Sequence, residues 1–131
     1  MAKAIHTMIR VLDTDRSVKF YREAFGLEPS HVLDYPDFCL TYLRNDENDF
    51  EIELTENKGR TDPYELGTAY GHLAVCVSEL EAEHSRLKSA GISVGDVKAM
   101  KHGEHVVARF FFVTDPDGYK IEVLEKSGHY V

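Results

Sequence analysis

Apolar and polar residues alternate in several short stretches of this chain, and in two other stretches the apolar residues lie three or four positions apart. Alternation over about four to eight residues is typical of a β-strand with one buried face, and the longer spacing is typical of an amphipathic helix. In its first half the chain is predicted to form a strand over 4–11, a helix over 13–25, and strands over 29–33, 38–43 and 50–55.

The second half repeats this order of elements. A strand over 70–77 precedes a helix over 79–90, and strands follow near 92–97, 106–113 and 119–124. Gly26 and Gly91 occupy the same place after the two helices, where a glycine commonly ends a helix. The sequence Asp115-Pro116-Asp117-Gly118 predicts a tight turn before the last strand.

The repeated order predicts an α+β fold built from two βαβββ modules. We expect one domain over 1–131, with the first module at about 4–57, a polar linker at about 58–69 and the second module at about 70–126. Each module is too small to bury its sheet alone, so two modules must pair, within one chain or across a dimer. The alternative is a plain α+β domain whose halves are similar by accident.

Composition and charge exclude some classes of function. The net charge of −8 argues against binding to nucleic acid, which requires lysine and arginine against the phosphates. No apolar run is long enough for a transmembrane helix, and the first residues do not resemble a signal peptide. Cys39 and Cys76 are far apart in the sequence and are expected to be reduced thiols. We therefore expect a cytoplasmic protein.

The two modules each offer one histidine on the first strand and one glutamate on the last. Because side chains alternate between the faces of a strand, His6 and Glu53 lie opposite the apolar residues of their strands, and so do His72 and Glu122. The separations are similar, 53 − 6 = 47 and 122 − 72 = 50 residues. If the first and last strands of a module are neighbours, each histidine stands beside its glutamate.

Two imidazoles and two carboxylates form a ligand set that suits Ni²⁺, Co²⁺ or Zn²⁺. A single histidine or glutamate on a strand is usually part of the solvated surface, but four at matching points of a repeat favour a metal site. The remaining histidines are expected on the surface: His31, His84, His102, His105 and His129.

Several segments resemble the glyoxalase I (lactoylglutathione lyase) family of the vicinal-oxygen-chelate superfamily. The most specific are Glu65-Leu66-Gly67-Thr68-Ala69-Tyr70-Gly71-His72 and Asp115-Pro116-Asp117-Gly118-Tyr119-Lys120-Ile121-Glu122. Weaker matches lie at 6–11, 17–21 and 52–57, so the resemblance extends over nearly the whole chain. It implies a half-open β-barrel that encloses the metal, and modules that pair across a homodimer.

The resemblance also implies an activity and roles for individual residues. The family isomerises the hemithioacetal of methylglyoxal and glutathione to S-lactoylglutathione, through an enediolate whose charge a divalent cation stabilises. It implies that His6, Glu53, His72 and Glu122 are the metal ligands and that Glu122 is also the catalytic base. Related short bacterial enzymes favour nickel or cobalt, which we expect here, with zinc as the alternative.

Substrate contacts follow from the resemblance less directly. Arg10 and Asn57 are implied to contact glutathione, although Arg10 could be a surface residue of an edge strand and Asn57 a turn residue. Two departures concern the same substrate. Lys58 replaces a common aromatic residue, and 97–109 is longer than the family's Lys-Gly-Gly loop, so that Lys101 is the candidate for the loop lysine.

Other members of the superfamily remain as alternatives. Thiol transferases that inactivate fosfomycin lack the second carboxylate, epimerases of coenzyme A thioesters have an amide in its place, and ring-cleaving dioxygenases use longer chains with one carboxylate. Glu53 argues against all three. A non-catalytic module that binds small molecules, such as a bleomycin-resistance protein, would lack the four ligands. An enzyme that acts on another thiol adduct stays open, and so does a degenerate enzyme that is kept as a binding protein.

Overall fold

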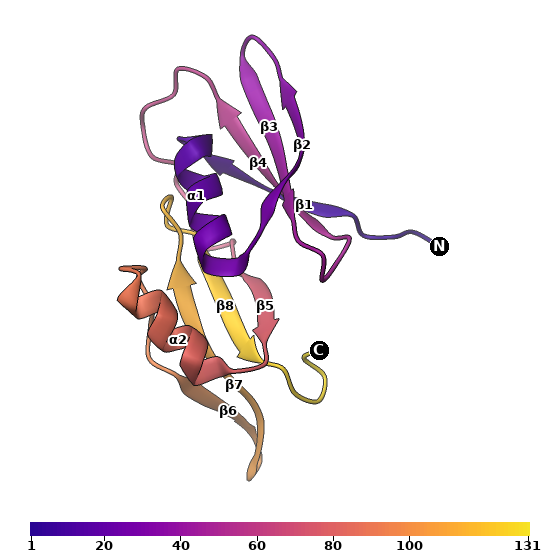
Figure 1. Cartoon of the computed structure of the whole chain (residues 1–131), viewed down its shortest axis with the longest axis vertical. Coiled ribbons are helices and arrows are strands. Elements are labelled where there is room, and N and C mark those ends of the chain that lie inside the picture. The colour runs from indigo at the N-terminus through magenta and orange to yellow at the C-terminus, as the bar shows by residue number, and fades with distance from the viewer. The chain divides into compact units, whose positions relative to one another are not determined.

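A four-stranded sheet with one helix across it forms each half of the chain (Figure 1). The computed structural model describes residues 1–131, and the chain divides into two compact units, residues 1–65 and 66–131. The elements of unit 1 are β1 (His6–Val11), α1 (Thr14–Phe25), β2 (Glu28–Asp34), β3 (Phe38–Arg44) and β4 (Glu51–Asn57). Those of unit 2 are β5 (Leu73–Val77), α2 (Leu80–Ser89), β6 (Lys98–His102), β7 (His105–Thr114) and β8 (Lys120–Glu125).

The two sheets have the same topology. Their strand orders are β1-β4-β3-β2 and β5-β8-β7-β6. In each, the first strand pairs in parallel with the last, and the other pairs are antiparallel. The predicted α+β fold of two βαβββ modules is therefore confirmed, and so is the condition that the first and last strands of a module are neighbours.

Helix α1 begins and ends where the sequence predicts. The Asp13 carboxylate accepts a hydrogen bond from the Arg16 amide at 3.0 Å, and Gly26 ends the helix in the left-handed region at φ 64°. The buried face of this helix does not include all of its apolar residues. Tyr21 is buried, but Val18 and Phe25 are only partly covered. The other buried residues of this helix are Ser17, Phe20 and Ala24.

In unit 2 the structure corrects the bounds of two predicted strands, 92–97 and 70–77. Residues 92–97 contain only an isolated bridge between Val94 and Val113, whereas the edge strand is β6. Strand β5 begins at Leu73, so His72 lies immediately before it.

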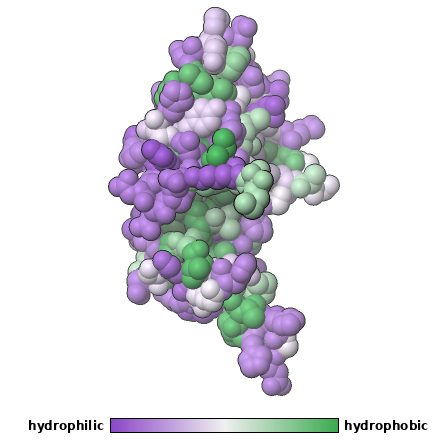
Figure 2. Space-filling view, turned by 90° about the vertical axis from the view of Figure 1, so that its right-hand side faces the viewer, coloured by the Kyte–Doolittle hydropathy of each residue, from purple (hydrophilic) through white to green (hydrophobic).

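The segment 97–109, which was compared with a loop of the family, is mainly a β-hairpin, and its second strand is the one predicted near 106–113. His102 pairs with His105 across a two-residue turn, and Gly103 has the positive φ (63°) that this turn requires. Lys101 consequently lies on strand β6, next to a register shift, and not on a flexible loop. Exposed hydrophobic and hydrophilic residues both occur on the hairpin, which forms the lower end of the view in Figure 2.

One face of each sheet is buried beneath its helix. In unit 1 the fully buried strand residues are Val11, Leu43 and Leu54, and in unit 2 they are Phe111, Val113 and Val123. Along β4 and β8 the core residues alternate with Glu53 and Glu122, so the opposite face of each sheet carries these candidate ligands. No helix is long and apolar enough to cross a membrane.

Replacement of Phe111 by alanine tests this assignment of the core. The Phe111 side chain is fully buried, so its loss leaves a cavity and should lower the free energy of unfolding by about 3–5 kcal/mol. Val107→Ala is the matched control on the same strand, because Val107 is 39% exposed and should lose well under about 1 kcal/mol. Urea unfolding followed by circular dichroism measures both. Equal losses in the two variants would contradict the assignment.

Candidate metal centre

The first His–Glu pair forms between β1 and β4. The Nε2 atom of His6 lies 3.0 Å from the Oε2 atom of Glu53. The register of the two strands places Met8 opposite Glu53. His6 lies two residues before Met8 and therefore on the same sheet face. The Glu53 side chain is 11% exposed and the His6 side chain 36%, which makes the carboxylate the more deeply seated partner.

The second pair has the same geometry in unit 2. The Nε2 atom of His72 lies 3.0 Å from the Oε2 atom of Glu122, and the register places Ala74 opposite Glu122. His72 lies two residues before Ala74, as His6 lies two residues before Met8, although it precedes the first residue of β5. The repeat seen in the sequence therefore extends to the placement of the functional side chains.

The turn before β8 positions Glu122. The Asp115 carboxylate accepts hydrogen bonds from the amides of Asp117 and Tyr119, each at 2.9 Å, and Gly118 has φ 94°. Such a side-chain bond closes a tight turn and fixes where the next strand starts. The Asp-Pro-Asp-Gly motif thus determines the register in which Glu122 faces His72.

The spacing within each pair fits coordination of one cation. Metal–nitrogen and metal–oxygen bonds are about 2.1 Å long, so two ligand atoms at a right angle lie about 3.0 Å apart. The same distance suits a hydrogen bond when no metal is present. Nowhere do three or more histidine, cysteine, aspartate or glutamate side chains gather in a position to hold a metal, so each unit by itself offers two ligands.

The two glutamates have different neighbours. The Thr55 hydroxyl donates a hydrogen bond to Oε1 of Glu53 at 3.3 Å, and Tyr42 lies directly across from Glu53 on β3. Burial of its hydroxyl, followed by the charge of Glu53 and a hydrogen bond with it, raises the pKa of Tyr42. The Tyr42 ring packs edge-on against His6, with centroids 5.6 Å apart.

In unit 2 the corresponding neighbours are apolar. Phe112 lies across from Glu122 on β7 and packs edge-on against His72, with centroids 5.4 Å apart. Leu124 follows Glu122 at the position that Thr55 occupies after Glu53. Tyr42 and Thr55 were not predicted as site residues from the sequence. Aligning the two modules strand by strand would have exposed both differences.

The predicted substrate residues lie on different elements. Arg10 pairs with Thr55 between β1 and β4, so it shares the sheet face of His6 and Glu53. Asn57 ends β4 and its amide donates to the Tyr64 hydroxyl at 3.0 Å. Lys101 belongs to unit 2 and is exposed on β6. Arg10 and Asn57 are therefore brought to one face, and Lys101 is not in that unit.

Lys58, which replaces a common aromatic residue of the family, is used for structure. Its ammonium group donates to the Asp34 carboxylate at 2.5 Å and to the Tyr35 carbonyl at 2.6 Å. The hydrogen bond to Asp34 raises the pKa of Lys58. The lysine thus ties the end of β4 to the end of β2.

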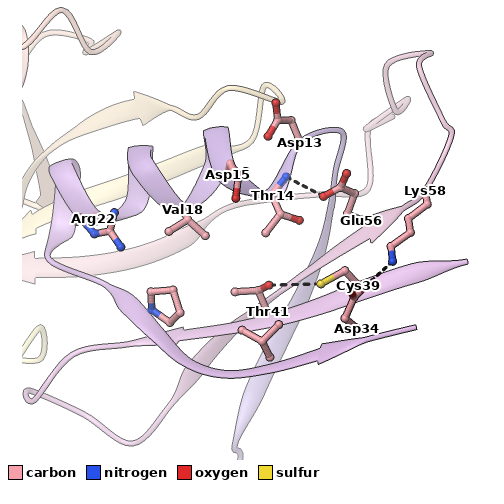
Figure 3. A pocket seen from close by; sticks show the side chains of 12 residues that line it. Asp13, Thr14, Asp15, Val18, Arg22, Asp34, Cys39, Thr41, Glu56 and Lys58 are labelled. Atoms are coloured by element: carbon pink, nitrogen blue, oxygen red, sulfur yellow. Dashed lines mark hydrogen bonds and ion pairs between the residues drawn. The ribbon is translucent and has the colours of Figure 1, made fainter. Parts of the chain in front are cut away.

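A cavity of about 880 Å³ in unit 1 is lined by residues of α1 and of the sheet beneath it (Figure 3). It lies between α1 and the sheet face that carries Cys39, Thr41 and Glu56, which is opposite the face of Glu53. Several of its polar groups are already paired. The Glu56 carboxylate accepts from the Thr14 amide at 3.0 Å, and the Cys39 thiol lies 3.9 Å from the Thr41 hydroxyl. The candidate ligands are absent from its lining.

Comparison with known proteins identifies relatives of this chain. The chain is 42% identical over 128 residues to lactoylglutathione lyase of Haemophilus influenzae, covering 94% of this chain and 92% of that protein. Its structure is similar to that of the trypanothione-dependent glyoxalase I of Leishmania major, with a TM-score of 0.77 and 32% identity over 96% of this chain and 88% of the other.

The structure is also similar to glyoxalase I of Zea mays, with a TM-score of 0.84 and 30% identity over 96% of this chain and 45% of that longer one. The Glyoxalase/Bleomycin resistance protein/Dioxygenase superfamily profile matches residues 3–123, nearly the whole sequence. The chain therefore belongs to this superfamily, as its sequence motifs had indicated.

Proposed function

We propose that this protein is a lactoylglutathione lyase that binds one divalent metal ion through His6, Glu53, His72 and Glu122. The observation that carries the proposal is the occurrence of two His–Glu pairs with the same 3.0 Å separation at equivalent points of two modules. Four such ligands would leave positions for substrate oxygens. Relatives that share about 40% of the sequence over almost their full length are named for this activity.

The reaction moves a proton from C1 of the hemithioacetal to C2, and the hydroxyl proton on the C1 oxygen moves to the C2 oxygen. A metal ion held by the four residues would supply positive charge that stabilises negative charge on these oxygens. Glu122 removes the proton from C1 and returns it to C2, a role that requires a carboxylate within hydrogen-bond reach of both carbons. Arg10 would hold a carboxylate of glutathione, and Asn57 would pair with its peptide groups.

The four ligands come from two modules, each of which offers only one pair. We place the complete site at the pairing of modules across a homodimer, so that each site draws ligands from both chains. The mixed nitrogen and oxygen set suits nickel, cobalt or zinc, and we favour nickel or cobalt because the chain resembles the short bacterial enzymes of the family. Both cysteines are free thiols, in keeping with the reducing cytoplasm that we propose as its location.

Metal reconstitution tests the proposed activity. Protein stripped with a chelator is expected to be inactive, and added Ni²⁺ or Co²⁺ should restore formation of S-lactoylglutathione from methylglyoxal and glutathione, with less activity in Zn²⁺ and least in Mg²⁺. The thioester absorbance follows the reaction, and sedimentation measures the oligomeric state of the same samples. Absence of thioester with every metal would sink the assignment.

Replacement of Glu122 by glutamine tests the role of the base. The amide keeps the size of the side chain but cannot accept the proton, so kcat should fall by at least about 10³-fold while the circular dichroism spectrum is unchanged. Glu47→Gln is the matched control, because Glu47 is exposed in the turn between β3 and β4. An active Glu122→Gln enzyme would move the role elsewhere, with Glu53 as the first candidate.

Replacement of Arg10 by glutamine tests recognition of the thiol. Loss of a charged hydrogen bond of about 1.5–3 kcal/mol should lower kcat/KM for the glutathione adduct by about 10- to 100-fold. The adduct of 2-mercaptoethanol, which has no carboxylate, should be affected little by the change. Arg44→Gln, an exposed arginine at the end of β3, is the control. An equal loss with both adducts would contradict a carboxylate contact and favour a different thiol carrier.

A further inference from the structure

The two His–Glu pairs have matching geometry but unlike neighbours on the same sheet face. Tyr42 lies directly across from Glu53, and Phe112 lies directly across from Glu122. Each ring packs edge-on against the histidine of its own pair, at nearly the same distance. The modules therefore place an aromatic ring at the same point, but only one of the rings carries a hydroxyl.

The next position along each last strand repeats this contrast. Thr55 follows Glu53 by two residues and donates a hydrogen bond to its Oε1 atom at 3.3 Å. Leu124 follows Glu122 by two residues, is 4% exposed and has nothing to donate. The Glu53 side chain thus has two polar neighbours in addition to His6. The Glu122 side chain has one polar contact, with His72.

We propose that Tyr42 and Thr55 are positioning residues that fix Glu53 and thereby distinguish the two carboxylates. A carboxylate that accepts hydrogen bonds must break them before it turns, while one that faces a phenyl ring and an isobutyl group gives up only its histidine contact. Glu53 is then held in one orientation, whereas no side chain other than His72 would hold Glu122. The inference rests on the proposed function, because it distinguishes two of its proposed ligands.

Nickel binding tests the positioning of Glu53 without recourse to activity. Apo-protein is titrated with Ni²⁺ alone against a competing chelator. Partners of metal ligands typically contribute about 10- to 100-fold to affinity, so Tyr42→Phe should raise the Kd for Ni²⁺ by at least about 10-fold, and Tyr42→Phe/Thr55→Val by more. Tyr130→Phe is the matched control, because Tyr130 packs against His129 and lies after the last strand of unit 2. Its Kd should equal that of the wild type.

Exchange of the two aromatic residues tests the distinction between the glutamates. In the wild type, Glu122→Gln should lower kcat much more than Glu53→Gln. In Tyr42→Phe/Phe112→Tyr the hydroxyl faces Glu122 instead, and the ratio of these two losses should shrink by at least about 10-fold. A purely structural role of Tyr42 would lower both activities together and leave the ratio unchanged. Circular dichroism and urea unfolding show that the exchanged protein is folded.

The outcomes separate this inference from the proposed function. Wild-type protein that binds Ni²⁺ and forms thioester, together with Tyr42→Phe protein of unchanged Kd or an unchanged ratio in the exchange, overturns only the positioning role. Wild-type protein that binds no metal overturns the metal site and the inference with it. A raised Kd in Tyr42→Phe and a reduced ratio after the exchange would support the proposal.

Discussion

Parallel pairing between the first and last strands of each module is the constraint on which the candidate site depends. The two strands are far apart in sequence, and the intervening helix and hairpin bring them side by side in parallel. In this register a histidine near the start of one strand meets a glutamate in the middle of the other. A shift of either strand by one residue would turn its ligand to the buried face and destroy the pair.

Each module provides one His–Glu pair. Its helix packs on the apolar face of the sheet, which is filled by residues such as Leu54 and Val123. The opposite face carries the His–Glu pair. Two carboxylates and two imidazoles brought together without a cation would leave like charges close to each other. With one pair in each module, each of these glutamates contacts the histidine of its own module, and an aromatic ring packs against that imidazole.

A duplicated scaffold gives the two His–Glu pairs the same geometry, and the pairs differ in the residues around their glutamates. A hydroxyl on Tyr42 and another on Thr55 distinguish Glu53 from Glu122. Local substitutions of this kind leave the packing of the sheet intact, since tyrosine and phenylalanine fill nearly the same space. Symmetry of the fold and asymmetry of the chemistry are therefore compatible.

The sequence by itself determined the order of the elements, the repeat, the faces on which the four candidate ligands lie and the membership of the superfamily. These depend on local periodicity, turn residues and short motifs, which are written in consecutive residues. It was wrong about residues 92–97 and did not predict strand β6 within 97–109, because edge strands without a buried face have a weak pattern. Tertiary structure alone decided which residues face one another across strands. The Tyr42 hydroxyl is relevant to the site because Tyr42 pairs with Glu53 across β3 and β4. That pairing is a tertiary contact that no local sequence pattern encodes.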